Sequence, residues 1–184
     1  MLDMVTPMTA EWVRIAKLKY GNRIPGLGDD NIYIFIDPCV SKNTSVASFG
    51  FMVDPTKPRF LYRIVVNPYW AYMMPEDTIR QVIGHEIAHY VHFKFDCYDI
   101  GNMAAVKKWE QSILPDGDGG HNSGFSSICA TLGVAERVAR AYYIATIHDA
   151  IVGTIKEKIL KYGLGTFILD THHLEYMRKN TIKF

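Results

Sequence analysis

The chain has 184 residues, 48% of them hydrophobic, and its 20 basic residues nearly balance 19 acidic ones. A chain of this length and composition can bury a hydrophobic core, which excludes a disordered protein. The net charge of +1 argues against a dedicated nucleic-acid-binding protein, although not against an enzyme that works near DNA.

The three cysteines are widely spaced and contain no C-x-x-C pair: Cys39, Cys97 and Cys129. This pattern disfavours both a disulfide framework and a cysteine-built zinc ribbon, so we expect buried thiols in a reducing compartment. The N-terminal residues do not form a signal peptide, and no apolar run reaches the roughly 18 residues that span a bilayer. These features predict a soluble cytoplasmic protein with no membrane partner.

The first predicted element is a helix over residues 9–20, with Thr9 as its N-cap and Gly21 at its end. Three strands are expected at 32–36, 46–53 and 60–66, because each is rich in β-branched and aromatic residues and is bounded by turn residues. Residues 54–58 indicate a hairpin connection between the last two strands. We therefore predict a small antiparallel sheet.

Apolar residues at helical spacing return from Pro75 to about Phe95, with two acidic residues in the first turn. Further helices are predicted at 103–114 and 122–132, separated by a Gly-rich stretch at 115–120. The sequence after residue 140 predicts a hairpin module or a helix, and periodicity does not decide between them. The predicted fold class is α+β, with a main domain over 1–140 and a small C-terminal module over 141–184.

The long predicted helix contains the motif H-E-x-x-H, from His85 through Glu86 to His89. Its histidines are four residues apart on one helix face, so both imidazoles can reach one ion. Zinc binds imidazole nitrogens at about 2.0–2.1 Å in a roughly tetrahedral arrangement. Glu86 can reach a water molecule at the ion without binding the ion itself, and can act as its general base. The motif therefore predicts a Zn2+ site with His85 and His89 as ligands and Glu86 as the catalytic residue.

A catalytic zinc ion usually has three protein ligands and leaves its fourth position to water. His121 is the favoured third ligand, because it follows a flexible Gly-Gly pair and opens a predicted helix that could fold back over the first motif. His92 is an alternative on a neighbouring helical face. Glu110 and Glu136 are the nearby downstream glutamates, at spacings that suit a ligand poorly.

These motifs resemble the SprT-like metallopeptidase domain over about residues 9–140, on the H-E-x-x-H motif and the segments 120–125 and 128–133. The resemblance implies a zincin-like fold in which His121 is the third zinc ligand and Phe125 packs beneath it. It implies a zinc-dependent endopeptidase that hydrolyses protein or peptide substrates, which could be associated with DNA. Two departures are visible: Asn122 replaces the usual glycine, and the tail lacks the four-cysteine zinc ribbon of many members.

Two other functions remain open: a zinc-containing binding or adaptor protein without proteolytic activity, and a hydrolase of another amide, such as a peptidoglycan fragment. In the tail, five side chains could form a second metal site, although a metal-free module is the simpler expectation: His148, Asp149, Asp170, His172 and His173. Basic and aromatic residues alternate there, but solvated surfaces commonly have this composition, so DNA is only weakly supported as a partner.

Overall fold

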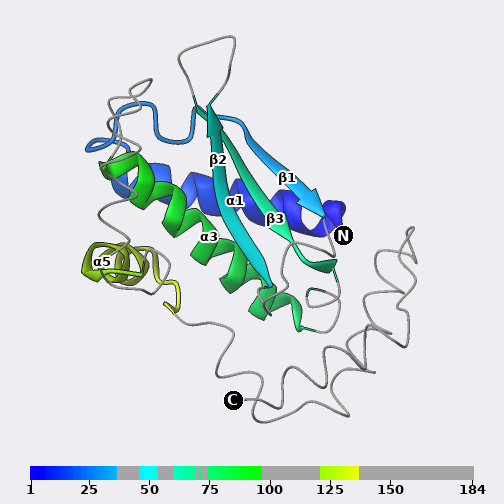
Figure 1. Cartoon of the computed structure of the whole chain (residues 1–184). Helices are drawn as coiled ribbons and strands as arrows, with labels where there is room; N and C mark the ends of the chain where they lie inside the picture. The colour runs from blue at the N-terminus through cyan, green and yellow to red at the C-terminus, as the bar shows by residue number, and fades with distance from the viewer. Residues whose placement is uncertain (37–45, 54–59, 69–70, 72–73, 97–120, 137–184) are drawn as a thin grey trace, which may run out of the picture.

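The computed structural model describes residues 1–36, 46–53, 60–68, 71, 74–96 and 121–136 (Figure 1). Several predictions lie outside these residues: the connection at 54–58, the helix at 103–114, the stretch at 115–120 and the C-terminal module with its candidate ligands. Glu110, Cys39 and Cys97 also lie outside. Cys129, the cysteine that lies within them, is a buried free thiol, as predicted.

The described residues form an α+β fold, as predicted. Its elements are, in chain order, α1 (Leu2–Tyr20), β1 (Ile32–Ile36), β2 (Ala47–Val53), β3 (Phe60–Val66), α3 (Glu76–Asp96) and α5 (Ser123–Leu132). The three strands and the last two helices agree with their predicted bounds to within one residue. None of the described helices is long and apolar enough to cross a bilayer.

The prediction of an antiparallel sheet is wrong, because the sheet is mixed, with the strand order β1-β3-β2. β2 and β3 form the expected antiparallel pair, in which Ala47 lies opposite Val66. β1 pairs with the other edge of β3 in parallel, with Ile32 opposite Tyr62. The chain reverses from β1 to β2 and again from β2 to β3, so β1 and β3 run in the same direction. Their adjacency therefore makes their pairing parallel.

Helix α1 begins at Leu2 and continues through Pro7, so the predicted start at Thr9 is also wrong. Thr9 is buried within the helix, and its hydroxyl donates a hydrogen bond to the Val5 carbonyl. A proline within a helix removes a backbone hydrogen bond. Packing offsets this cost, because Met4, Val5 and Met8 are all buried in the core.

Helices α1 and α3 pack against the same face of the sheet (Figure 1). Aromatic side chains fill the layer between the sheet and α3: Tyr62 lies edge-on to Tyr90 at 5.0 Å, and Phe51 lies 4.2 Å from Phe93. At the far end of α3, buried Lys94 forms an ion pair with Asp30 at 2.9 Å, and the Tyr90 hydroxyl donates to the same carboxylate. This network fixes α3 against the connection that precedes β1.

Candidate metal site

The histidines of the motif and its glutamate lie on adjacent faces of α3. His85 and His89 lie toward α5, with ring centroids 4.9 Å apart. Successive helical residues differ by about 100° in direction. Glu86 is therefore turned to the side of the histidines that faces the sheet, where its carboxylate hydrogen-bonds the Phe49 backbone of β2. The helical spacing that suggested the motif thus gives the two histidines a common direction and the glutamate a different one.

His121 lies directly before the N-cap of α5. The cap is Asn122, whose extended backbone lets its side chain accept a hydrogen bond from the Phe125 N–H at 3.0 Å. At the other end, Gly133 ends the helix with a φ of 76°, a left-handed conformation that favours glycine. Because α5 packs against α3, its capped N-terminus brings His121 back over the first two histidines.

The three histidines predicted as ligands form one cluster, in which a ring nitrogen of each lies within 4.8 Å of the others. The Nε2 atoms of His85 and His121 are 3.1 Å apart. The ring centroid of His121 lies 5.0 Å from that of His85 and 4.9 Å from that of His89. Residues 36 positions apart in the chain thus meet at one point.

These side chains fit a transition-metal ion. Two nitrogens that bind one zinc ion tetrahedrally at about 2.0–2.1 Å are separated by about 3.3 Å. The observed separation of 3.1 Å between His85 Nε2 and His121 Nε2 is close to this value. Sets of three imidazoles occur in catalytic zinc sites with an open fourth position, but imidazole also suits copper, iron and nickel. The cluster could therefore hold a metal ion, and its geometry alone does not select the metal.

The electrostatic environment of α3 favours the neutral form of His85 and His89. Burial lowers the pKa of His85 to about 4, and the neighbouring His121 imidazole lowers it further. Burial also lowers the pKa of His89 well below its usual value, with His85 and His121 contributing. Since the neutral imidazole is the form that binds metal, His85 and His89 are ready to bind at neutral pH.

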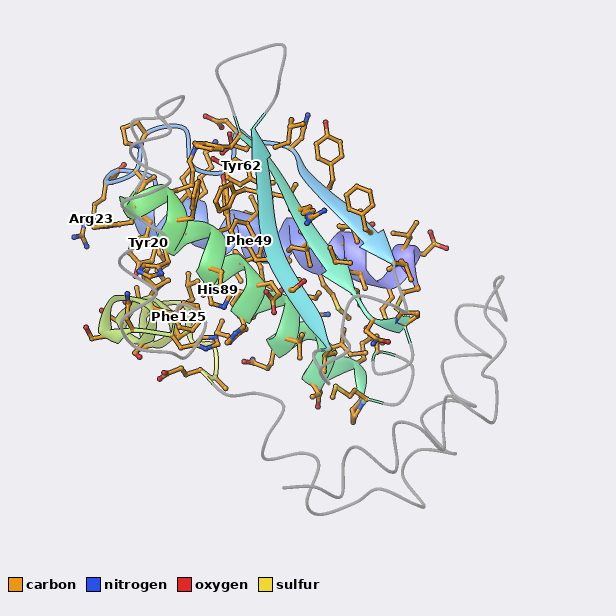
Figure 2. All side chains as sticks on the ribbon, viewed as in Figure 1. Tyr20, Arg23, Phe49, Tyr62, His89 and Phe125 are labelled. Atoms are coloured by element: carbon orange, nitrogen blue, oxygen red, sulfur yellow. The ribbon has the colours of Figure 1, made fainter. Side chains whose placement is uncertain are left out.

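Phe125 lies against all three imidazoles. It is fully buried, and its ring stacks on His89 at 4.1 Å with an interplanar angle of 21°. Its centroid lies 5.0 Å from that of His85 and 4.9 Å from that of His121. Figure 2 shows His89 and Phe125 next to each other between α3 and α5. The aromatic ring restricts the orientations of all three imidazoles.

Glu86 is buried beside the free edge of the described sheet. Burial raises its pKa to about 8, and the hydrogen bond with the Phe49 backbone acts in the opposite direction. Without a nearby cation, the carboxyl group is therefore largely protonated at neutral pH. A divalent cation at the histidine cluster would favour the charged carboxylate and oppose this shift.

Of the alternative third ligands, the two that the structure describes do not join the cluster. His92 is buried, but it lies behind Phe125, with ring centroids 6.2 Å apart. Glu136 exerts an electrostatic effect on His85 without belonging to the group of converging side chains. The sequence analysis missed the role of Asn122, which it treated only as a departure from a family pattern. Its position before an apolar helical run is a typical N-cap signal.

No protein-family model matches this chain, and neither does any curated protein or solved structure. The interpretation of the site therefore depends on its own residues and geometry.

Proposed function

We propose that this protein is a zinc-dependent endopeptidase of the SprT-like kind, with a zincin-like arrangement of sheet and motif helix. The main support is the convergence of His85, His89 and His121 at one point. A helical H-E-x-x-H motif can arise by chance, but chance does not bring a third histidine to within 3.1 Å of the first. Glu86, which a purely structural metal site would not require, supports a catalytic role.

The three histidines would hold the zinc ion, and Glu86 would accept and donate the proton of the attacking water. A bound zinc ion polarises a carbonyl group and makes a water molecule acidic enough to attack near neutral pH. Glu86 accepts the proton from the attacking water and then donates it to the leaving amine. Its burial supports this role, because a water-poor environment brings the pKa of a carboxyl group toward the pH at which it must exchange protons.

The position of β2 suggests how a peptide substrate binds. Among the described strands, β2 pairs only with β3, so one of its edges has no strand neighbour there. The hydrogen bond between Glu86 and the Phe49 backbone places the carboxylate against this strand. An extended peptide that pairs with β2 through its backbone would therefore lie close to Glu86. Backbone pairing makes few demands on side chains, so we expect broad sequence tolerance.

The test compares wild type with Glu86→Gln and His121→Ala, measuring bound zinc per chain and cleavage of a denatured protein. We expect Glu86→Gln to retain zinc and lose roughly 100-fold or more in cleavage rate. We expect His121→Ala to lose both zinc and cleavage. Glu11→Gln is the matched control, because this glutamate lies on the exposed surface of α1 in an ion pair with Arg80.

Two results would contradict the proposal. The first is undiminished cleavage by Glu86→Gln. The second is a wild-type protein that binds zinc but cleaves neither denatured protein nor DNA-bound protein, which would favour the adaptor function. Cleavage of cell-wall fragments alone would instead favour a different amide hydrolase at the same centre.

A further inference from the structure

Strand β1 forms the edge of the described sheet opposite to β2, and its sequence contains none of the residues that usually protect an edge. Within the part of the chain that the structure describes, it pairs only with β3. Its five residues, Ile32–Ile36, include no charged residue and no proline. The unpaired backbone groups of an edge strand can pair with another chain, and natural proteins commonly prevent this with charges or proline. The composition of β1 therefore indicates an edge that has a partner.

Both faces of β1 leave apolar surface accessible to solvent. Tyr33 and Phe35 lie on the face of the sheet away from the helices, where they are 45% and 48% exposed (Figure 1). On the other face, Ile32, Ile34 and Ile36 pack against the core but are only partly buried. A further strand along the free edge would cover part of both rows of side chains.

The sequence of β1 is complementary to itself in an antiparallel arrangement. Two copies related by a two-fold axis at Ile34 would place Ile32 opposite Ile36 of the second copy, and Tyr33 opposite Phe35. Each exposed aromatic ring would then meet an exposed aromatic ring of the other copy, and such cross-strand pairs stabilise sheets. Two-fold symmetry, the commonest symmetry of homodimers, repeats each of these contacts. A second copy of this chain therefore suits both rows at once.

The acidic residues that precede β1 do not oppose this pairing, because each has a basic partner in its own chain. Asp29 forms an ion pair with Lys17 at 2.6 Å, and Asp30 forms one with Lys94 at 2.9 Å. Their charges are thus compensated within each copy. An uncharged edge gives no attraction to a charged partner, whereas a second copy presents the same uncharged aromatic strand.

We propose that two copies of this protein associate through β1, antiparallel about Ile34, to form one continuous sheet. Five residues a side are fewer than the roughly 20–30 that each partner contributes to an interface of standard size. The association is therefore reversible, with a dissociation constant in the micromolar range or weaker. Because β1 and β2 are opposite edges, the β2 edge beside Glu86 stays outside the interface. Dimerisation requires neither a metal ion nor peptide hydrolysis, so it goes beyond the proposed function.

Sedimentation equilibrium of the metal-free protein over a range of concentrations measures the dissociation constant. Wild type should shift from the mass of one chain toward that of two. Tyr33→Lys combined with Phe35→Lys puts like charges opposite each other across the axis and should weaken association at least about tenfold. Tyr33→Lys combined with Phe35→Glu puts opposite charges there and should recover part of this loss. The matched control is Leu18→Lys, at an α1 side chain that is 72% exposed, which should leave the dissociation constant unchanged.

Amide hydrogen exchange of residues 32–36 identifies what covers the edge. If a second copy covers it, exchange should slow as the protein concentration rises, and the double lysine variant should lose this dependence. Protection that is equal at all concentrations overturns the inference, because another part of the same chain then covers β1. A wild type that stays monomeric up to about 1 mM also overturns it. Equal dissociation constants for the two double variants overturn the antiparallel register. Thermal unfolding verifies that each variant remains folded.

Discussion

Gly84 lies where α3 passes α1, directly before His85. A Cβ atom added at Gly84 would lie 2.6 Å from Cε2 and 2.8 Å from Cζ2 of Trp12. Trp12 cannot easily move away, because it is buried and its indole N–H donates to the Arg80 carbonyl at 2.7 Å. The substitution Gly84→Ala therefore sets helix propensity against packing.

The two effects have opposite signs. Alanine is more favourable than glycine within a helix by about 1 kcal/mol. Carbon atoms pack at about 3.5–4.0 Å, so the new methyl group would have to displace the Trp12 ring by about 1 Å. Overpacking of a core typically costs about 1–3 kcal/mol, and weakening the indole hydrogen bond adds about 1 kcal/mol. The sum is a net cost, and we expect Gly84→Ala to destabilise the protein by about 1–3 kcal/mol.

Urea unfolding of the metal-free protein, in a double-mutant cycle with Trp12→Leu, separates the two effects. With the indole removed, only propensity remains, and Gly84→Ala should stabilise the protein by up to about 1 kcal/mol. The sign of the effect should thus reverse between the two backgrounds. If Gly84→Ala stabilises the protein equally in both, α1 and α3 are not in the close contact described above.

Three further predictions concern the site. Between pH 6.5 and 8, the free energy of unfolding of the metal-free protein should fall by about 2 kcal/mol as the pH rises. The cause is Glu86, which keeps its proton in the folded protein up to its raised pKa of about 8. In the unfolded chain the same carboxyl group releases its proton near pH 4.5. Denaturant titrations of Glu86→Gln should show no such loss over this pH range. Below pH 6.5, His85 has the opposite effect: its lowered pKa destabilises the folded state as the pH falls. Zinc at about 100 times its dissociation constant should stabilise wild type by about 2.7 kcal/mol, or about 5–10 °C in a thermal scan, and His121→Ala should abolish this shift. Asn122→Ala should cost about 1 kcal/mol in a urea titration through loss of the helix cap, and an equal loss in Asn122→Asp would contradict the capping role.

The strands were predictable because their local composition is distinctive, but their order was not. The composition of β1 predicts an extended conformation, but it does not predict which strand β1 pairs with. Pairing β1 with β3 rather than β2 made the sheet mixed. The early start of α1 was likewise decided by tertiary packing, because burial of Met4, Val5 and Met8 offsets the proline.

The candidate site was predictable in its local part. A spacing of four residues on one helix face aligns His85 and His89 whatever the rest of the fold does. The meeting with His121 requires the packing of α5 on α3. The sequence indicated this packing through the flexible Gly-Gly pair before His121 and through resemblance, and neither fixes the geometry. The hydrogen bond from the Ala135 N–H to the Gln81 side chain joins residues 54 positions apart, and neither belongs to a recognisable motif. Such supporting contacts arise from the geometry of the folded chain.

Residues 121–125 place a candidate ligand, a helix cap and the aromatic ring that supports the cluster within little more than one helical turn. A helix of ten residues is rarely stable by itself, so α5 depends on what it contacts. If the cluster holds a metal ion as proposed, removal of the metal should act first on this helix, which would separate from α3 before the sheet melts. The thiol of Cys129, now shielded on the buried face of α5, would then become open to alkylation. Its rate of labelling would therefore report whether the site is occupied, before the rest of the fold is lost.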